Sequence, residues 1–231
     1  TVLAVIVGHV LGLLAAINQN SLLDQVVRLF AILGASTAIF WLALVFIYFF
    51  YYRLGWAAAP LDRLDVGIAS PTRLTGFYTL DSLLTGNWLA LRSSLGHLTL
   101  PALALGFIVS APIIKIVRAA MLDVLHSDFI RTARTIGVPY RQIILRDGLR
   151  NAMIPILTTI GIVFGYLMAG NVLVERIFAW PGMGYYAWDA LNNKDVEAIQ
   201  GFVLLIATLY VLLNLAIDLL YSVIDPRIRL G

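Results

Sequence analysis

Five long runs of apolar residues limit what this chain can fold into. A helix of about 20 apolar residues crosses a bilayer core roughly 30 Å thick. Unpaired backbone groups are costly in lipid, so such runs should be helices, and none of them alternates as barrel strands do. The sequence therefore predicts an all-α integral membrane protein, a single transmembrane domain over residues 1–231, whose spans are 1–17, 30–52, 98–117, 153–174 and 202–224.

The composition agrees with a membrane protein. Hydrophobic residue types make up 61% of the chain and charged residues 13%, whereas about 25% of an ordinary soluble domain is charged. There is no cysteine, and His9, His97 and His126 lie far apart, so no metal site is predicted. The chain opens at Thr1 in an apolar run without the marks of a signal peptide, so we expect the natural polypeptide to begin upstream.

The basic residues favour one side of the membrane. Seven lysines and arginines lie between Lys115 and Arg150, whereas the stretch 175–200 is net acidic. Cytoplasmic loops carry an excess of Lys and Arg. The sequence therefore predicts a cytoplasmic loop over 118–150 and external loops over 53–97 and 175–200.

The basic loop has the pattern of two short helices joined by a tight turn. Ser127 or Asp128 is placed to cap the first helix, and Gly137 to end it in a left-handed conformation. Pro139 fits the first turn of the second helix, where its missing N–H has no partner to lose. We call residues 128–150 the arginine segment.

Three functions would use the arginine segment. A helix-turn-helix reader of DNA has this outline, but the adjoining spans leave it little freedom to reach a duplex, so we expect no nucleic-acid partner. An amphipathic hairpin at the lipid surface and a docking surface for a cytoplasmic partner are the other two. The periodicity of the residues does not separate these two.

Several motifs resemble those of one family. Arg131–Gly137, RTARTIG, is similar to R-T-A-x-x-x-G, a variant of the loop signature E-A-A-x-x-x-G, and Leu149–Pro155, LRNAMIP, is similar to the stretch that follows it. Val174–Gly184 is similar to V-E-x-x-F-x-x-P-G-x-G, and Asp225–Arg229 to a D-P-R-I-R ending. By these motifs the chain resembles the inner-membrane permease subunits of bacterial ABC importers, in the dipeptide, oligopeptide and nickel branch, and there the B-type subunit.

The resemblance implies a type I ABC importer permease fold that imports di- or oligopeptides across a bacterial inner membrane by alternating access. The same architecture importing nickel chelates or glutathione is the alternative, and an ion-coupled secondary transporter is the alternative from another class. Expected partners are a C-type sister permease, two ATP-binding subunits, an extracytoplasmic substrate-binding protein and membrane lipid. ATP and Mg belong to the ATP-binding subunits, because this chain contains no G-x-x-x-x-G-K-[ST] loop and is expected to be neither an enzyme nor a cofactor binder.

The resemblance also makes the first helix of the arginine segment a coupling helix that docks on an ATP-binding subunit. Phe129 and Ile130 would supply its apolar anchor, and Arg131 or Arg134 its charged hydrogen bonds. The full set of expected coupling residues is Asp128, Phe129, Ile130, Arg131, Thr132, Ala133, Arg134 and Gly137.

Polar residues in or beside the spans are candidates for the transport path or gate. Asn214 and Asp218 are four residues apart, so they share a helix face and can share a hydrogen bond. They either line a path or fix their helix against a neighbour. Asn171, with Glu175 after it, either lines an external vestibule or caps the fourth span.

The second external loop carries an element with a turn-forming core, made of Trp180, Pro181, Gly182 and Gly184. It is either a gate-side structure that faces a substrate-binding protein or an anchor at the lipid interface. Aromatic residues of both external loops would suit a belt at the outer interface. These are Trp56, Phe77, Tyr78, Trp88, Trp180, Tyr185, Tyr186 and Trp188.

Overall fold

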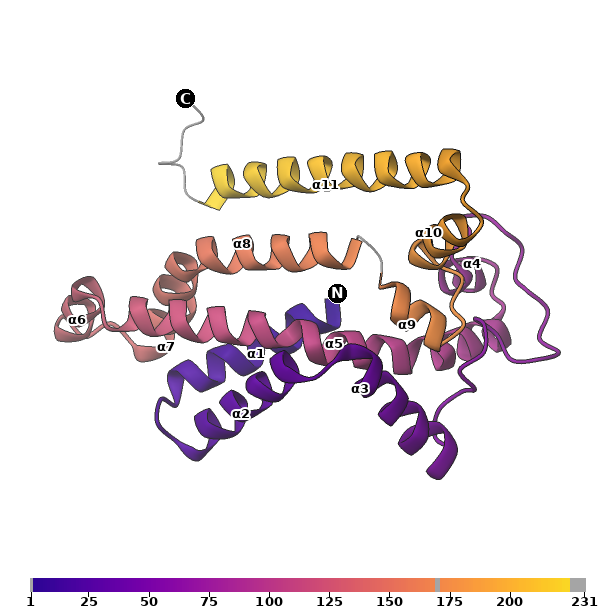
Figure 1. The fold of residues 1–231 in the computed structure, drawn as a ribbon. Helices are drawn as coiled ribbons and strands as arrows, with labels where there is room; N and C mark the ends of the chain where they lie inside the picture. The colour runs from indigo at the N-terminus through magenta and orange to yellow at the C-terminus, as the bar shows by residue number, and fades with distance from the viewer. Residues whose placement is uncertain (1, 169–170, 225–231) are drawn as a thin grey trace. The chain divides into compact units, whose positions relative to one another are not determined.

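The computed structural model describes residues 2–168 and 171–224, with side chains as far as residue 220. Every regular element in these residues is helical, as Figure 1 shows, which confirms the predicted all-α fold. In chain order the elements are α1 (Val2–Ile17), α2 (Leu22–Ser36), α3 (Ile39–Phe46), the π-helical η1 (Ile47–Arg53), α4 (Tyr78–Leu84), α5 (Trp88–Leu125), α6 (Asp128–Thr135), α7 (Tyr140–Gln142), the π-helical η2 (Ile143–Gly148), α8 (Leu149–Met168), α9 (Val172–Ile177), α10 (Met183–Asn192) and α11 (Val196–Ile224).

The chain divides into two compact units. Unit 1 consists of Thr1–Ser36, Phe107–Met168 and Leu204–Gly231, and unit 2 of Thr37–Gly106 and Ala169–Val203. The arginine segment belongs to unit 1, whereas the turn-forming element of the second external loop belongs to unit 2. Each candidate site therefore lies within one unit.

The described helices supply three or four candidate membrane spans. Three are long and apolar enough to cross a membrane, namely Trp88–Leu125, Tyr140–Met168 and Val196–Leu220. The pair Leu22–Ser36 and Ile39–Arg53 makes a fourth if its two helices count as one broken span. The apolar helix α1 is shorter, with 16 residues. We predicted five continuous runs, and the run 30–52 differs from that prediction because its helix breaks between α2 and α3.

Close packing of small residues on larger ones builds the core of unit 1. A Cβ added to Gly8 of α1 would lie 2.6 Å from Ile113 Cγ2 of α5, and one added to Gly12 would lie 2.7 Å from Val117 Cβ. Small residues allow the backbones of two helices to come this close. Close packing of this kind is a main source of association between membrane helices. The same core contains Ile130 of α6 and Ile156 of α8, so the arginine segment is attached to the helices of unit 1.

A buried ion pair also links two helices of unit 1. The Asp24 carboxylate of α2 is fully buried and accepts hydrogen bonds from Nε and Nη2 of Arg118 of α5, at 2.7 and 2.9 Å. The backbone N–H of Asn20 donates a third bond at 3.0 Å. Arg28 approaches the same carboxylate to 3.7 Å. A buried carboxylate needs such partners, so the pair fixes the start of α2 against α5.

Unit 2 has a smaller core around α9. Val174 of α9 and Phe178, the C-cap residue that follows it, are buried against Ala43 of α3 and against Leu100 and Ala104 of α5. The two residues lie four positions apart, so both side chains are on the same side of this helical turn. The packing fixes the position of α9 and of the turn that follows it.

Candidate functional site

The first helix of the arginine segment ends as the sequence predicts. Gly137 has φ +83°, its N–H donates to the Arg134 carbonyl at 3.1 Å, and the Val138 N–H donates to the Ala133 carbonyl at 3.0 Å. These two bonds form a Schellman motif, in which glycine takes the left-handed position without steric cost. Pro139 then begins the next helical turn, so both local predictions are confirmed.

The predicted cap at the other end of α6 differs in detail. Ser127 occupies the N-cap position, but its hydroxyl donates to the carbonyl of Val124 and does not accept from the helix. Asp128 is almost fully exposed, and its carboxylate lies 3.5 Å from Nη1 of Arg131. Thr132 is also exposed and donates from Oγ1 to the Asp128 carbonyl at 3.0 Å.

The structure separates the two residues predicted as one apolar anchor. Ile130 is fully buried in the core of unit 1 and has no surface for a partner, which corrects that part of the prediction. Phe129, the adjacent residue, is 47% exposed. Ala133 is half-buried and packs against the same core as Ile130. The helix therefore has an inner side, held by its own chain, and an outer side.

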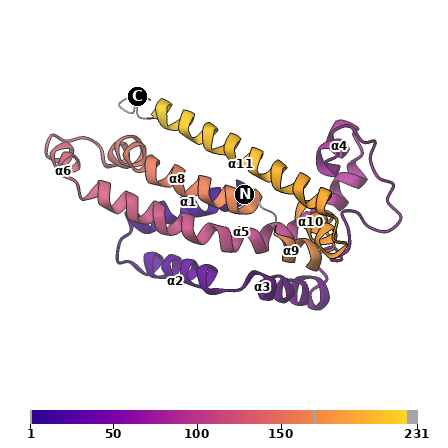
Figure 2. The ribbon, with the colours of Figure 1, turned by 45° about the horizontal axis from the view of Figure 1, so that its top comes forward.

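The outer side combines cations with apolar groups. Arg131 and Arg134 are exposed, and the Arg134 guanidinium lies 5.5 Å from the centroid of the Tyr140 ring. Phe129, Ile136 and Tyr140 expose large apolar surfaces on the same segment. Figures 1 and 2 show α6 beyond the end of α5. Exposed arginines among exposed rings are the residue types that bind a protein partner most strongly.

In unit 2, residues 171–192, which we call the tryptophan segment, form two helices around a second turn. Asn171 caps α9 by accepting the Val174 N–H at 3.3 Å, so the helix that it caps is α9 rather than the fourth span. The Ala179 N–H donates to the Arg176 carbonyl at 3.2 Å and the Trp180 N–H to the Glu175 carbonyl at 2.7 Å. This is a second Schellman motif.

The Glu175 carboxylate joins the two helices of the tryptophan segment. Its Oε2 accepts the backbone N–H of Tyr185 in the first turn of α10 at 2.7 Å. Burial raises the pKa of Glu175, while hydrogen bonds from the N–H groups of Tyr185 and Gly184 oppose the rise. The free N–H groups of a helix N-terminus favour a carboxylate at this place. Glu175, predicted as a path or gate residue, thus has its partners inside its own segment.

The two glycines of this segment are required by the approach of that carboxylate. A Cβ on Gly182 would overlap the Glu175 carboxyl group, and one on Gly184 would lie 3.2 Å from Glu175 Oε2. Pro181, between Trp180 and Gly182, is exposed. The motif V-E-x-x-F-x-x-P-G-x-G therefore has a structural reason: Glu175 binds α10, and the glycines leave room for it.

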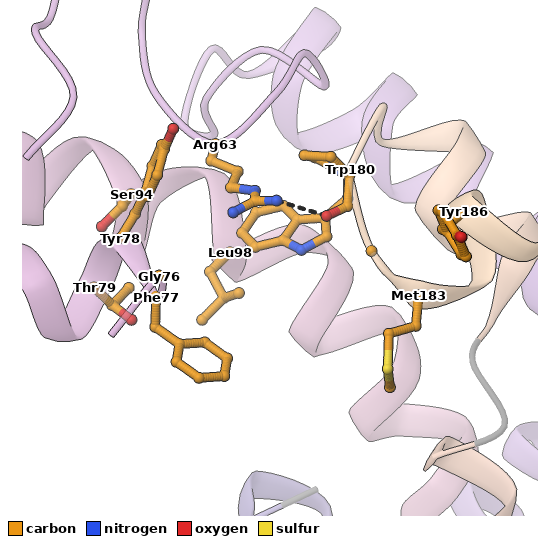
Figure 3. A pocket seen from close by; sticks show the side chains of 12 residues that line it. Arg63, Gly76, Phe77, Tyr78, Thr79, Ser94, Leu98, Trp180, Met183 and Tyr186 are labelled. Carbon is orange, nitrogen blue, oxygen red and sulfur yellow. Dashed lines mark hydrogen bonds between the residues drawn. The ribbon is translucent and has the colours of Figure 1, made fainter. Parts of the chain in front are cut away.

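A cavity of about 660 Å³ lies beside this turn, within unit 2. Arg63 is at its wall, where Nη2 donates to the Pro181 carbonyl at 2.6 Å (Figure 3). The Arg63 guanidinium also lies 5.1 Å from the Tyr78 ring centroid and 6.0 Å from that of Trp180. Rings and apolar chains that line the cavity include Phe77, Tyr78, Leu98, Trp180, Met183 and Tyr186. Four of the aromatic residues predicted for a lipid belt therefore surround a cavity.

A buried carboxylate supports the opposite wall. Asp81 of α4 is fully buried and accepts the N–H and hydroxyl of Thr75 at 2.8 and 2.7 Å and the N–H of Gly76 at 3.1 Å. Burial alone would raise the pKa of Asp81, but these hydrogen bonds hold it below its ordinary value. Asp81 thereby fixes the loop that leads to Phe77.

The predicted pair on α11 is not joined. Asn214 and Asp218 are both exposed in the described part of the chain, where no hydrogen bond connects their side chains. Their exposure leaves neither side chain buried against another helix in the described part of unit 1. The C-terminal motif, Asp225–Arg229, lies outside the described residues.

Sequence reasoning missed the residues that act over long distances along the chain. Arg63 belongs to no motif, and its bond to Pro181 joins residues 118 positions apart. Asp24 and Arg118 are separated by 94 positions. Their only signal in the sequence is that charges are rare, and that signal does not identify a partner.

Comparisons with known proteins all point to one family of transport proteins. The model of the family described as binding-protein-dependent transport system inner membrane component matches residues 8–230. A probable D,D-dipeptide transport system permease protein of Escherichia coli (strain K12) is 45% identical over 229 residues, 99% of this chain and 67% of that protein. A dipeptide transport system permease protein of Alkalihalophilus pseudofirmus is 41% identical over 233 residues, which cover 99% of this chain and 68% of that protein. A di/tripeptide transport system permease protein of Pseudomonas aeruginosa is 40% identical over 222 residues, 96% of this chain and 66% of that protein. The chain thus spans about two thirds of the length of these relatives.

Proposed function

The chain belongs to the family of binding-protein-dependent transport system inner membrane components, which are transport subunits and not ATPases, and we propose that it carries dipeptides inward as one of two permease subunits of an ABC importer. The observation that carries this proposal is the similarity to three permeases named for dipeptide or di/tripeptide transport, at 40% to 45% identity. Oligopeptides, nickel chelates and glutathione are alternative cargoes for the same architecture.

The two-sided helix α6 supports the proposed coupling mechanism. An ATP-binding subunit would bind the outer side, with Phe129 as the apolar anchor and Arg131 and Arg134 as hydrogen-bond donors. A movement of that subunit would pass through the buried Ile130 to the core that contains α5 and α8. The arginine segment thus acts as a lever between the ATPase and the spans.

The rest of the assembly follows from this proposal. Residues 118–150 face the cytoplasm, and 53–97 and 175–200 form external loops that meet an extracytoplasmic substrate-binding protein. A sister permease of the C-type completes the translocation path, and two ATP-binding subunits bind ATP and Mg. Exposed apolar residues along α11, such as Leu212 and Leu215, are available for lipid or for the sister permease.

Uptake by the reconstituted transporter tests this function. The chain is tagged in its native membranes, purified with the subunits that accompany it, and placed in liposomes with ATP inside and labelled dipeptide with binding protein outside. We expect an ATP-binding subunit in the purified complex and uptake that stops when ATP is omitted. Uptake that continues without ATP but stops when the proton and sodium gradients are dissipated would instead establish an ion-coupled transporter.

A further inference from the structure

We propose that the cavity of unit 2 binds the carboxylate of a short peptide, and that Arg63 is the residue that contacts this carboxylate. The inference rests on the proposed function, because it takes the ligand to be the transported cargo. It assigns a binding site to unit 2, lined by residues of its loops and of α4, α5 and α10.

Arg63 is fixed in place but its charge is not matched. One nitrogen, Nη2, donates to the Pro181 carbonyl, and the rings of Tyr78 and Trp180 flank the guanidinium. The Nε atom is buried and has no hydrogen-bond partner among the described residues. No carboxylate of the described chain forms an ion pair with Arg63. A shielded guanidinium without a carboxylate partner favours an anionic ligand.

The two acids that support the cavity, Glu175 and Asp81, already accept hydrogen bonds from the protein itself. Glu175 accepts the N–H of Tyr185, and Asp81 accepts three hydrogen bonds from Thr75 and Gly76. Neither acid is among the residues that line the cavity, whereas Arg63 is. The walls are therefore held by the buried Asp81 and the half-buried Glu175, and the charge presented to a ligand is positive.

The remaining lining residues define the rest of the ligand. Small-molecule sites are commonly cavities of about 300–1,000 Å³ with apolar walls and a few polar groups, and a volume of about 660 Å³ lies in that range. Phe77, Leu98 and Met183 offer apolar surface, and the hydroxyl oxygens of Thr79 and Ser94 are polar groups of the lining. An inorganic anion would leave the apolar surface unused. A ligand with a carboxylate next to an apolar or aromatic side chain would contact both Arg63 and the apolar surface.

Equilibrium dialysis with a matched pair of ligands tests the site. The assembled transporter in lipid nanodiscs, without ATP and without binding protein, is dialysed against labelled alanyl-phenylalanine or alanyl-phenylalanine amide at pH 7. The two probes differ in the terminal carboxylate, so the ratio of their dissociation constants measures its recognition. Hydrogen bonds between charged groups predict that the acid binds roughly tenfold to a hundredfold more tightly than the amide.

Two variants and a control show which residue recognises the terminal carboxylate. Arg63→Gln should bring the ratio close to one, while Leu98→Trp, which fills the cavity and keeps Arg63, should weaken both probes. Arg73→Gln changes an exposed arginine outside the cavity and should leave the ratio unchanged. Because the ratio compares two ligands on one protein, a modest loss of folded Arg63→Gln complex does not alter it.

The results separate this inference from the proposed function. A ratio near one in the unchanged protein, or a high ratio that survives Arg63→Gln, overturns the site even if ATP-driven dipeptide uptake is normal. The site is also overturned if Arg63→Gln leaves dialysis unaffected but weakens binding of the substrate-binding protein, since the cavity then serves that protein. Acid-selective binding without ATP-driven uptake would leave the site standing and overturn the proposed function.

Discussion

Two turns in this chain have the same backbone design and different surroundings. In the arginine segment α6 ends with Gly137 in the left-handed conformation, and in the tryptophan segment α9 ends with Ala179, at φ +47°, in the same place. Each turn continues with an apolar residue and a proline, and in each an arginine of the first helix lies over a ring of the second. Arg134 lies 5.5 Å from the Tyr140 ring centroid, and Arg176 lies 5.3 Å from that of Trp188.

The difference between the turns lies in the groups that hold them. Glu175 binds the first turn of α10, so the tryptophan segment is closed on itself. At the position equivalent to Glu175, α6 has Ala133; its own acid, Asp128, is exposed in the first turn and lies 3.5 Å from Arg131. The arginine segment is instead held by the side chain of Ile130, which is buried in the core of unit 1. The arginine segment, proposed as a lever, needs a firm attachment on its inner side and a free outer side. The tryptophan segment, which forms a wall of the cavity, needs bonds within itself.

Reversing one charge on the free face should produce the largest functional loss. Arg134→Glu is expected to lower dipeptide uptake by about tenfold or more while ATP hydrolysis continues, because like charges placed across an interface cost several kcal/mol. Arg176→Glu, at the equivalent position of the second turn, should leave the ratio of uptake to hydrolysis unchanged. Both rates are measured in the same proteoliposomes. Normal coupling in Arg134→Glu would remove this arginine from the lever.

The inner attachment should dominate the stability of α6. Ile130→Ala removes a fully buried side chain and is expected to cost about 2–5 kcal/mol of unfolding free energy. Phe129→Ala removes a side chain that is 47% exposed and should cost much less, but should weaken ATPase binding. Unfolding of the purified complex in denaturing detergent measures the loss of stability. Co-purification of the ATP-binding subunit measures the loss of binding. Equal destabilisation by the two variants would contradict a two-sided helix.

Removing the internal bond of the tryptophan segment should cost less. Glu175→Ala leaves the N–H of Tyr185 without its acceptor, for an expected loss of about 1–3 kcal/mol in local stability. Asp128→Ala should change stability little, since that carboxylate is almost fully exposed. Hydrogen exchange at α10 and α6 reports the two losses separately. Unchanged exchange at α10 in Glu175→Ala would show that other contacts hold this wall.

Exchanging the residues at the two left-handed positions should give small effects of opposite sign. Gly137→Ala introduces a Cβ at φ +83° and is expected to cost about 1 kcal/mol, although nothing crowds the added atom. Ala179→Gly relieves that cost and should stabilise its turn by about 0.5–1 kcal/mol. Thermal unfolding of both variants in one detergent tests this. Changes of the same sign would mean that the turns are not equivalent.

The smallest expected effect is a pH dependence confined to the tryptophan segment. The pKa of Glu175 is raised above 4.5 by burial, so the folded segment binds this proton more tightly than the unfolded one. The stability from this proton is complete below the ordinary pKa and is lost as pH rises through the folded value. Protection factors in α10, corrected for intrinsic exchange, should therefore increase as pH falls toward 4.5. Glu175→Gln should abolish the change, and α6 should not show it.

The sequence predicted what short-range chemistry determines. Gly137 and Pro139 mark the turn after α6 because each restricts its own backbone, and the apolar runs identify helices through the cost of unpaired groups in lipid. The break between α2 and α3 was missed, because the connecting residues Thr37 and Ala38 carry no proline or glycine signal.

Tertiary contacts account for the other failures. Burial of Ile130 beside exposed Phe129 depends on which face of α6 meets the core, and the motif does not specify that face. The tie from Glu175 to Tyr185 spans ten positions, and the bond from Arg63 to Pro181 spans 118. A motif marked Glu175 as important without indicating its partner, and Arg63 stood in no motif.

The ion pair of Asp24 and Arg118 has a consequence for biosynthesis. A ribosome that adds about 5–20 residues per second makes Arg118 roughly 5–20 s after Asp24, because 94 positions separate them. During that interval α2 exists without α5, and Arg28, four residues further on, is the cation already in reach of the Asp24 carboxylate. Helix α2 therefore leaves the ribosome with Arg28 as a temporary counter-ion of Asp24, and the arrival of Arg118 adds the bond that joins α2 to α5.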